Sequence, residues 1–339
     1  MKNFRNRFIV DIALLAVAVV WGGSYLAAKG LTATASVPAV LGWRFLVASL
    51  ALSALWTWRV RRLPGRTELL TGVALGLTQA AVLFMETFGV AGTSAGNAGL
   101  IIALTVIFTP LLDAVATRRW LPRGFFVAAA ICVVGVALLV SGDGLRAPNP
   151  GDLLMLAAAG VRAGHVTLMG TLTRNKPYSS ITVTLLQSLV CAVLGMAVDP
   201  AGMVQAATAF DPTDWLGILY LGLAASVFAF LIQLWAVRRT SASRTSLLMG
   251  TEPVWAVLAG VLLAGESLGW IGALGALLIV AGCYAGQRIE ARFRSRPAPE
   301  ADPGQGATQA AGHGPEQDTE RGSTVGSAAG FALRGSPGP

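Results

Sequence analysis

Two ionisable side chains lie deep inside apolar stretches of this chain, where charge is costly. Glu252 is followed by Pro253 in the run LLMGTEPVWAV, and Arg162 stands near the middle of the apolar segment 151–172. A charged group near the centre of a bilayer costs about 2.5–3.5 kcal/mol even on a lenient insertion scale, so it faces a partner or a polar cavity. A carboxylate can bind a cation or a proton, and a guanidinium can bind an anion through two parallel donors. These residues therefore predict a site for charged groups.

We expect Glu252 and Arg162 to share one central cavity, with two interpretations open. Arg162 either binds an anionic group such as a carboxylate or serves as the internal counter-ion of Glu252. Pro253 removes a backbone donor and clashes with the carbonyl one turn earlier, so we expect the helix around Met249 to kink beside the Glu252 carboxylate. Such a break is tolerated only where it lines protein or a wet cavity. The alternative is that Glu252 is paired for packing and that Pro253 only bends the helix.

Three further side chains are candidates for the same cavity. His165 follows Arg162 by three residues and shares its helix face, where it is either a packed, hydrogen-bonded residue or a proton carrier. Trp21 and Tyr25 could stack on an aromatic or cationic ligand. Their alternative role is that of packing residues or anchors at the membrane interface.

Residues that carry catalysis, metal binding or redox chemistry are scarce. The chain has two histidines, His165 and His313, and its three cysteines, Cys132, Cys191 and Cys283, lie in apolar segments without a spacing motif. The sequence also lacks acidic clusters, phosphate loops and nucleophile motifs. We therefore predict that the protein is not an enzyme, and we expect no catalytic residues, disulfide framework, metal site or cofactor.

The composition indicates a membrane protein. Of the 339 residues, 54% are hydrophobic and only 12% are charged, and the mean hydropathy is +0.65, whereas soluble domains have about 25% charged residues. Breaks that are polar, rich in Gly and Pro or rich in Arg separate apolar runs, and a helix of about 20 residues crosses a bilayer. We expect ten spans, near residues 9–28, 38–58, 69–91, 94–117, 123–141, 151–172, 178–197, 214–237, 243–264 and 267–287.

The basic residues between the spans predict the orientation of the chain. With the N-terminus inside, the gaps on the far side hold only Lys29 and Arg146, which is the positive-inside pattern. The cytoplasmic gaps hold Lys2, Arg5, Arg7, Arg59, Arg61, Arg62, Arg66, Arg118, Arg119, Arg123, Arg174, Lys176, Arg238, Arg239, Arg244, Arg288, Arg292, Arg294 and Arg296. We therefore expect a multi-pass protein of the plasma or inner membrane with both termini cytoplasmic. The net charge of +8 is then a basic rim and not a sign of nucleic-acid binding.

A weak internal repeat becomes visible when the chain is shifted by 147 residues against itself. The matches are Thr93-Ser94-Ala95 with Thr240-Ser241-Ala242, Leu100 with Leu247, and Gly135 with Gly282. A unit of five spans inserts upside down the second time because five is odd, and inverted repeats around a central site recur in secondary transporters. We expect an all-α polytopic membrane protein with ten transmembrane helices as two inverted five-helix repeats, residues 1–141 and 142–290. Residues 291–339 lack periodicity and predict a disordered cytoplasmic tail.

The same shift relates candidate residues in the two halves. Glu86 maps onto Gln233, and inversion puts them at mirrored depths, as in gates that close alternately on either side of a central site. The alternative is a polar pair that holds helices together. Arg44, in the outer third of its span, is a further candidate for gating or proton coupling.

Two polar residues of the span 94–117 are candidate cavity-lining residues. Thr105 maps onto Glu252, and Asn97 maps onto Arg244. The two lie at helical spacing on one span. We therefore add Asn97 and Thr105 to the residues expected at the site.

Several short motifs lie in or beside the expected spans. They are Trp21-Gly22-Gly23-Ser24-Tyr25 with Lys29, Arg44-Phe45, Thr93-Ser94-Ala95-Gly96-Asn97-Ala98, and Arg239-Thr240-Ser241-Ala242 through Glu252-Pro253 to Gly265-Glu266-Ser267-Leu268. Over about residues 9–287 the chain thereby resembles EamA-type transporters of the drug/metabolite transporter superfamily. The resemblance implies a ten-helix fold of two inverted repeats and the transport, often export, of small organic metabolites without ATP.

These observations predict a secondary transporter of exporter type. We expect it to move a small organic metabolite, such as an amino acid or a related zwitterion or anion, by alternating access, with protons as candidate coupling ions. A cationic or aromatic drug-like compound is the alternative substrate, and a channel or non-transporting scaffold is the alternative of another class. The expected partners are the lipid bilayer, the small-molecule substrate and protons, with no nucleic acid, and the chain is either a monomer or a homodimer. The substrate-binding candidates are Glu252, Arg162, His165, Trp21, Tyr25, Asn97 and Thr105, and the gating or proton-coupling candidates are Glu86, Gln233, Glu252 and Arg44.

Overall fold

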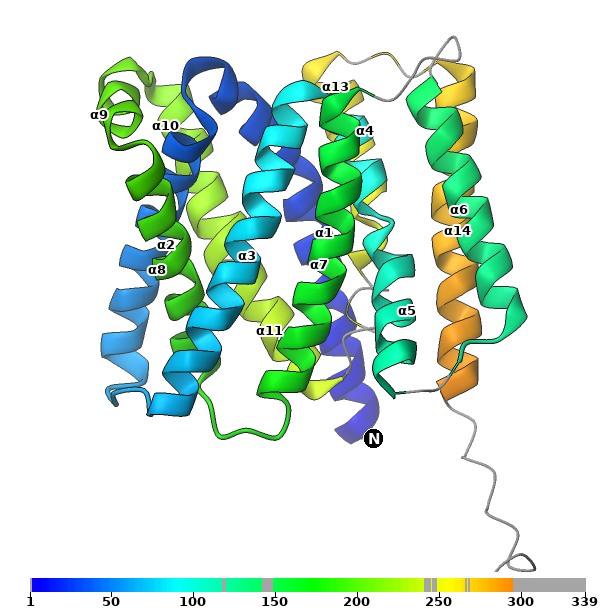
Figure 1. Ribbon diagram of the computed structural model, residues 1–339, viewed down its shortest axis with the longest axis horizontal. Coiled ribbons are helices and arrows are strands. Elements are labelled where there is room, and N and C mark those ends of the chain that lie inside the picture. The colour runs from blue at the N-terminus through cyan, green and yellow to red at the C-terminus, as the bar shows by residue number, and fades with distance from the viewer. Residues whose placement is uncertain are drawn as a thin grey trace, which may run out of the picture. The chain divides into compact units, whose positions relative to one another are not determined.

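The chain folds into long helices that run roughly along one common direction (Figure 1). The computed structural model describes residues 2–117, 120–141, 149–240, 245, 249–265, 267 and 269–294, and all regular structure in these residues is helical. The first half holds α1 (Lys2–Thr34), α2 (Val37–Arg59), α3 (Arg66–Gly92), α4 (Ala95–Ile102), α5 (Thr105–Thr117) and α6 (Arg123–Ser141). The second half holds α7 (Pro150–Thr173), α8 (Ser180–Val198), α9 (Pro200–Ala209), α10 (Pro212–Leu219), η1 (Tyr220–Phe228), α11 (Ala229–Arg239), α13 (Glu252–Ala264) and α14 (Trp270–Arg294).

Seven described helical stretches are long and apolar enough to cross a membrane, judged by length and composition. They are Ile9–Thr34, Val37–Arg59, Arg66–Gly92, Ala95–Val115, Pro150–Thr173, Ser180–Val198 and Pro212–Arg239. Three shorter apolar helices, Arg123–Gly135, Glu252–Ala264 and Trp270–Gly286, correspond to the fifth, ninth and tenth predicted spans. The chain is therefore a helical, multi-pass membrane protein, and the count of ten spans stays a prediction.

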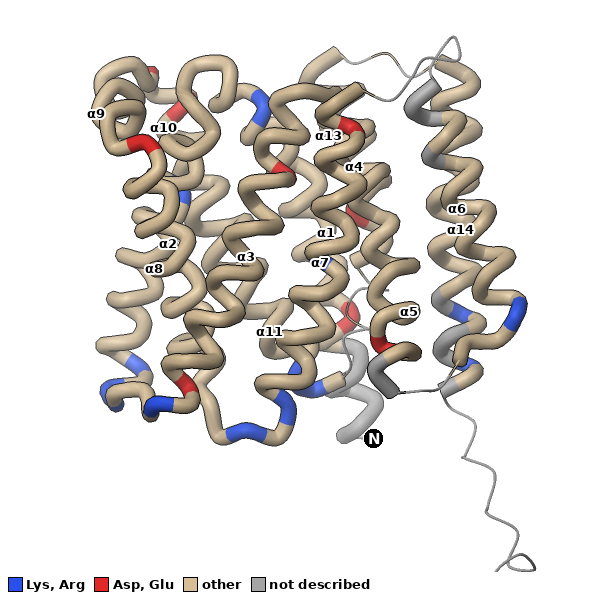
Figure 2. Tube along the Cα trace, in the orientation of Figure 1, with Lys and Arg blue, Asp and Glu red and all other residues tan. Residues whose placement is uncertain are grey.

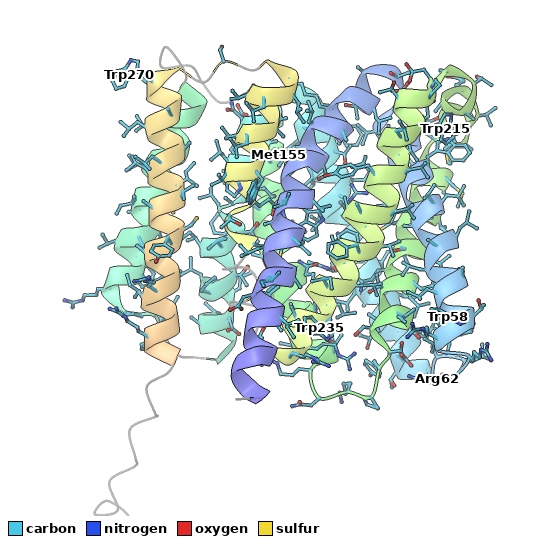
Figure 3. The ribbon with its side chains drawn as sticks, turned by 180° about the vertical axis from the view of Figure 1, so that it is seen from behind. Trp58, Arg62, Met155, Trp215, Trp235 and Trp270 are labelled. Atoms are coloured by element: carbon cyan, nitrogen blue, oxygen red, sulfur yellow. The ribbon has the colours of Figure 1, made fainter. Side chains whose placement is uncertain are left out.

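The two ends of the helices differ in charge. Figure 2 shows Lys and Arg gathered at the end where the N-terminus lies, around the connections from α2 to α3 and from α7 to α8. Exposed tryptophans lie near both ends: Trp58 is 61% exposed and Trp270 is 76% exposed (Figure 3). Tryptophan in such positions anchors helices at the level of the lipid headgroups.

Two predicted spans are discontinuous. The fourth consists of α4 and α5, which are separated at Ala103 and Leu104. In the ninth, helical Met249 is followed by a turn at Gly250 and Thr251, and α13 begins at Glu252 with Pro253 in its first turn, so the helix is interrupted where the kink around Met249 was expected. Proline is tolerated there because a backbone N–H at that position has no partner within the helix. The start of the predicted ninth span, residues 241–244 and 246–248, lies outside the described residues.

The eighth predicted span combines α10, η1 and α11. Tyr220–Phe228 forms a π-helix, a rare geometry that is frequent at functional sites and that its apolar sequence does not predict. At the other end of the chain, α14 continues to Arg294, so the predicted tail boundary at residue 291 falls inside a helix and was wrong. Residues 295–339, the remainder of the predicted tail, lie outside the described residues.

Candidate functional site

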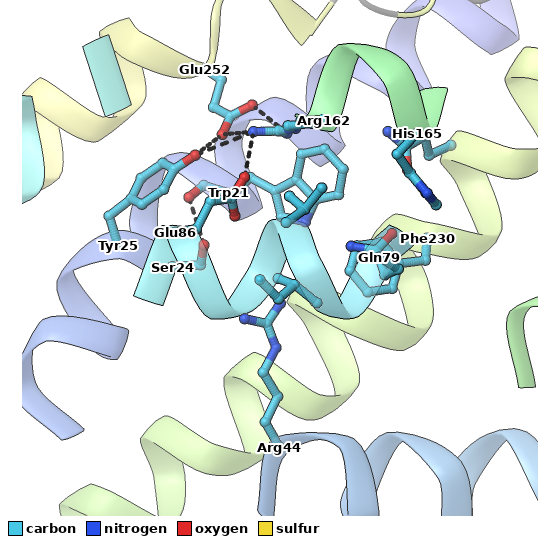
Figure 4. Close-up of a pocket in the computed structure, with 13 residues that line it drawn as sticks. Trp21, Ser24, Tyr25, Arg44, Gln79, Glu86, Arg162, His165, Phe230 and Glu252 are labelled. Carbon is cyan, nitrogen blue, oxygen red and sulfur yellow. Dashed lines mark hydrogen bonds and ion pairs between the residues drawn. The ribbon is translucent and has the colours of Figure 1, made fainter. Parts of the chain in front are cut away.

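A small buried cavity lies among α1, α2, α3, α7, α11 and the start of α13 (Figure 4). The residues that line it are Trp21, Ser24, Tyr25, Arg44, Gln79, Val82, Leu83, Glu86, Arg162, His165, Phe230, Gln233 and Glu252. Its volume is about 30 Å³, which is room for about two water molecules. In this conformation the cavity is therefore too small for an organic substrate, although it joins residues from both halves of the chain.

Arg162 and Glu252 form the central ion pair of this cavity. Arg162 Nη2 lies 3.0 Å from Glu252 Oε2, and Arg162 Nη1 donates to Glu252 Oε1 at 3.3 Å. The guanidinium thus holds the carboxylate through both terminal nitrogens, and the two side chains are only 8% and 5% exposed. Arg162 is therefore the counter-ion of Glu252, which is one of the two interpretations that the sequence left open.

Helix α1 adds two aromatic side chains to the ion pair. The Tyr25 hydroxyl donates to Glu252 Oε1 and accepts from Arg162 Nη1 at 3.4 Å. The Arg162 guanidinium lies over the Trp21 ring, 4.5 Å from its centroid, in a cation–π contact. Trp21 is held in turn because its Nε1 donates to Ala225 O at 2.9 Å. The aromatic rings thus fix the orientation of the guanidinium.

Glycine at position 22 lets α1 come close enough to α13 for these contacts. A Cβ atom on Gly22 would lie 2.4 Å from Trp255 Cβ and 2.8 Å from the backbone nitrogen of Ala256, distances at which the helices would have to separate. Trp21 and Tyr25 flank this contact on the same helix. The Trp-Gly-Gly-Ser-Tyr motif therefore combines the packing of α1 on α13 with two residues of the site.

Glu86 and Arg44 bring a second pair of opposite charges to the cavity. Glu86 Oε1 lies 3.5 Å from Arg162 Nη1, and the Glu86 side chain is 13% exposed. Arg44 reaches the cavity from α2 (Figure 4) and donates through Nε to Ser226 Oγ at 2.8 Å. Gln233 lines the same cavity. The predicted separation of Glu86 and Gln233 into gates at mirrored depths is therefore not seen in this conformation.

His165 is tightly packed and also lines the cavity. It is 2% exposed, and its Nδ1 is hydrogen-bonded to Thr78 Oγ1 at 2.7 Å. Its Nε2 has no hydrogen-bond partner among the described residues. The packed interpretation of His165 thus agrees with the geometry, and a role in carrying protons stays a prediction.

The two candidates on the fourth span differ in position. Thr105 lines a second cavity of about 20 Å³ that Arg162 and Glu252 also line, and its hydroxyl donates to Ala159 O at 3.3 Å. Asn97 lies in the first turn of α4, where its backbone N–H bonds to Ser94 Oγ at 3.0 Å. It is not among the residues that line either cavity, so the structure does not bring Asn97 to the site.

Sequence reasoning missed several cavity residues. Among them are Gln79, Val82 and Leu83, which line the cavity at helical spacing along α3 together with the candidate Glu86. The position of Glu86 already predicted that Gln79 shares its helix face. Ser226 has no such signal, because its contact with Arg44 depends on the π-helix.

Two segments of the chain, residues 8–141 and 149–285, match the model of the EamA-like transporter family. The chain belongs to this family. It is therefore a transporter of the drug/metabolite transporter type, as its motifs and its apolar helices predicted.

Proteins from several organisms are similar to this EamA-type transporter. It is 26% identical over 286 residues to the uncharacterized transporter YcxC of Bacillus subtilis, covering 80% of this chain and 90% of that protein. It is 27% identical over 284 residues to a Salmonella typhimurium protein named "Probable amino-acid metabolite efflux pump", covering 80% and 92%. It is 28% identical over 282 residues to the uncharacterized inner membrane transporter YedA of Escherichia coli, covering 78% and 86%. These names support a location in the membrane.

A solved crystal structure has a similar fold. It superposes with a TM-score of 0.63 over 84% of this chain and 99% of that chain, at 18% sequence identity. At that identity the likeness concerns the fold alone.

Proposed function

We propose that this protein is a secondary transporter that exports a small organic metabolite by alternating access. The observation that carries the proposal is the buried Arg162–Glu252 pair, with Glu86 and Tyr25 bonded to the same guanidinium, in a small central cavity. Charges at such positions of a membrane protein mark the path of a substrate or an ion. The network draws on both segments that match the family model, so a movement of one segment against the other would open the cavity.

An amino acid or a related zwitterion or anion is the proposed substrate class. Two guanidinium groups, Arg44 and Arg162, and two carboxylates, Glu86 and Glu252, line the cavity, so partners of both signs are available to a ligand. The name of the Salmonella typhimurium relative, which mentions amino-acid metabolites, supports this class. A cationic or aromatic compound bound through the two carboxylates is the alternative that a transport panel separates.

Two inverted five-helix repeats are the architecture that we propose. Contacts between α6 and α14 support it: a Cβ on Gly135 would lie 2.9 Å from Ile279 N, and one on Gly282 would lie 3.2 Å from Cys132 N. The shift of 147 residues relates Gly135 to Gly282 and also Cys132 to Ile279. The contacts are therefore reciprocal, as they are across a two-fold axis.

The discontinuous helices also support the repeat. Thr105 and Glu252, which the same shift relates, are the first residues of α5 and α13. In inverted-repeat transporters, broken helices in equivalent positions form the substrate site near the middle of the bilayer. Residues 1–141 and 142–290 are accordingly the proposed repeats, and Thr105 and Glu252, where α5 and α13 begin, both line the second cavity together with Arg162.

The cytoplasmic location of both termini is a proposal as well. Most of the described Lys and Arg residues gather at the end of the helices where the N-terminus lies (Figure 2). Short loops on the cytoplasmic side of a membrane protein carry the excess of basic residues. Protons are the proposed coupling ions because, among the described residues, the Glu86 carboxylate has one ion pair, the 3.5 Å contact to Arg162.

Uptake into inside-out membrane vesicles tests the proposal with a panel of amino acids and cationic aromatic drugs, with and without a pH gradient. We expect saturable uptake of an amino acid, and loss of this uptake in Glu252→Gln and in Arg162→Gln. Glu252→Gln leaves Arg162 with only its longer contact to Glu86, and Arg162→Gln leaves Glu252 without a cation. Loss of one partner of a buried ion pair costs about 3–5 kcal/mol, so both variants should melt at a lower temperature. The double variant regains thermal stability but not transport.

Three outcomes contradict the proposal. Unchanged uptake in either single variant shows that the ion pair is not part of the transport site. Flux that does not saturate with substrate indicates a channel. If only the cationic aromatic drugs are taken up, the substrate belongs to the alternative class of cationic or aromatic compounds.

A further inference from the structure

The guanidinium of Arg44 is buried and has no counter-ion in the part of the chain that the structure describes. Arg44 is 5% exposed, and no carboxylate of the described residues lies within 4.0 Å of it, whereas Arg62 and Arg162 do have acidic partners. A buried charge of this kind is costly unless something compensates it. Arg44 faces the cavity that contains Glu86, so the compensating group has room to come from a ligand.

The π-helix holds Arg44 in this position. Nε donates to Ser226 Oγ at 2.8 Å, Nη2 lies 3.5 Å from Ala225 O, and Ser226 Oγ donates in turn to Leu221 O at 2.8 Å. Nη1 has no hydrogen bond to any described residue. One edge of the guanidinium is therefore fixed by the protein, and Nη1 remains as a donor for a ligand.

Arg162 differs from Arg44 in this respect. Both of its terminal nitrogens bond to Glu252, and Nη1 also contacts Glu86. A substrate anion at Arg162 would have to displace a carboxylate from a bidentate pair. An anion at Arg44 displaces no protein carboxylate, so Arg44 is the better partner for it.

The balance of charge around the cavity narrows the class of ligand. Arg44 and Arg162 supply two positive charges, and Glu86 and Glu252 supply two negative charges. A ligand without net charge leaves this balance unchanged, whereas a free anion or cation adds an uncompensated charge in a medium of low dielectric constant. Val82, Leu83 and Phe230 supply apolar surface.

We propose that Arg44 binds the carboxylate of a zwitterionic amino acid with an apolar side chain, with its ammonium group on Glu86. The inference rests on the proposed transport function and assigns the substrate class to named groups. Glu86 can accept the ammonium because its one ion pair, at 3.5 Å, is the longer of the two that Arg162 makes. Ser226 is a positioning residue that acts through Arg44.

Binding by the purified full-length protein in detergent tests this assignment. The probes are L-leucine, isopentylamine, which is leucine without its carboxylate, and 4-methylpentanoate, which is leucine without its amine. The readout is the ligand-dependent rise in melting temperature, from which an apparent Kd follows for each compound. The variants are Arg44→Gln and Ser226→Ala, and Arg59→Gln at the exposed end of the same helix is the matched control.

We expect wild-type protein to bind L-leucine more tightly than either fragment. Arg44→Gln should weaken L-leucine and 4-methylpentanoate about 10- to 100-fold, as expected for the loss of a hydrogen bond to a charged group. Isopentylamine should bind to this variant at least as tightly as to wild type, because loss of the Arg44 charge leaves an excess negative charge in the cavity that a cation compensates. Ser226→Ala should weaken the binding of the same two compounds by a smaller factor. If Arg44→Gln does not fold, the result for Ser226→Ala tests the assignment. Arg59→Gln should bind all three compounds as wild type does.

Several results overturn the assignment: no binding of L-leucine to wild type, equal losses for all three compounds, or unchanged binding in both variants. Transport in vesicles is read separately, so the two proposals fail independently. Selective binding without any uptake contradicts the transport function and leaves the Arg44 site standing. Saturable uptake of other metabolites with no binding of L-leucine contradicts the Arg44 site alone.

Discussion

At the scale of single residues, one carboxylate oxygen joins two elements of the site. Glu252 Oε1 accepts from both Tyr25 OH and Arg162 Nη1. Tyr25→Phe removes one donor to this charged acceptor, a loss of about 1.5–3 kcal/mol, while the bidentate ion pair remains. We expect a lower melting temperature in detergent and a transport efficiency reduced at least tenfold in vesicles.

Tyr284→Phe is the matched control for this change. Tyr284 is 53% exposed on α14, so loss of its hydroxyl should alter neither measurement. If Tyr25→Phe transports and melts like wild type, the hydrogen bond to Glu252 contributes nothing to the site.

Polar and charged residue types in apolar segments predicted many of the residues at this site. They did not predict which of these residues contact one another. Arg162 and Glu252 were conspicuous because a membrane tolerates few charges. The sequence could not say that Arg162 is already neutralised by two carboxylates while Arg44 is not, because that depends on helices far apart in the chain. Asn97 failed as a candidate because helical spacing relates residues to one another and does not say which face of α4 meets the cavity.

At the scale of helices, the close contact of α4 with α13 places the start of α13 beside the cavity. A Cβ on Gly99 would lie 2.2 Å from Ala256 Cβ, and the next nearest atoms, in the Tyr25 ring, are 3.5 Å away. Gly99→Ala must therefore push the helices apart, at a cost of about 1–3 kcal/mol. We expect a lower melting temperature and reduced transport, because Glu252 moves with α13 away from Arg162.

A compensating change separates this mechanism from a general loss of stability. Gly99→Ala combined with Ala256→Gly removes the only contact below 3.5 Å that the added Cβ makes with the described residues, so the double variant should regain most of the lost stability and transport. Gly30→Ala on α1, with no atom within 4 Å of the added Cβ, should have no harmful effect. Lack of recovery in the double variant contradicts the steric explanation.

Hydrophobic runs and basic gaps predicted where most helices lie, but not their internal geometry. Apolar length sets the span of a helix, and seven predicted spans have full-length counterparts. Pro253 gave an ambiguous signal, since proline both kinks a helix interior and favours a first turn. The π-helix at Tyr220–Phe228 packs against α1 and α2, and Trp21 and Arg44 donate to Ala225 O, which are contacts that apolar length does not predict.

At the scale of the whole molecule, the proposed orientation predicts which surfaces face the cytoplasm. Leu63, 83% exposed, lies between α2 and α3 at the basic end, and Ala207 is exposed on α9 at the opposite end (Figure 1). Five predicted spans separate the two positions, an odd number that puts them on opposite sides of the membrane. In intact cells, a membrane-impermeant maleimide should label Ala207→Cys and should label Leu63→Cys only after permeabilisation. The native Cys132, Cys191 and Cys283 are at most 2% exposed and give little background. The reverse labelling pattern would contradict the orientation, and labelling of both from outside would contradict the odd count of spans.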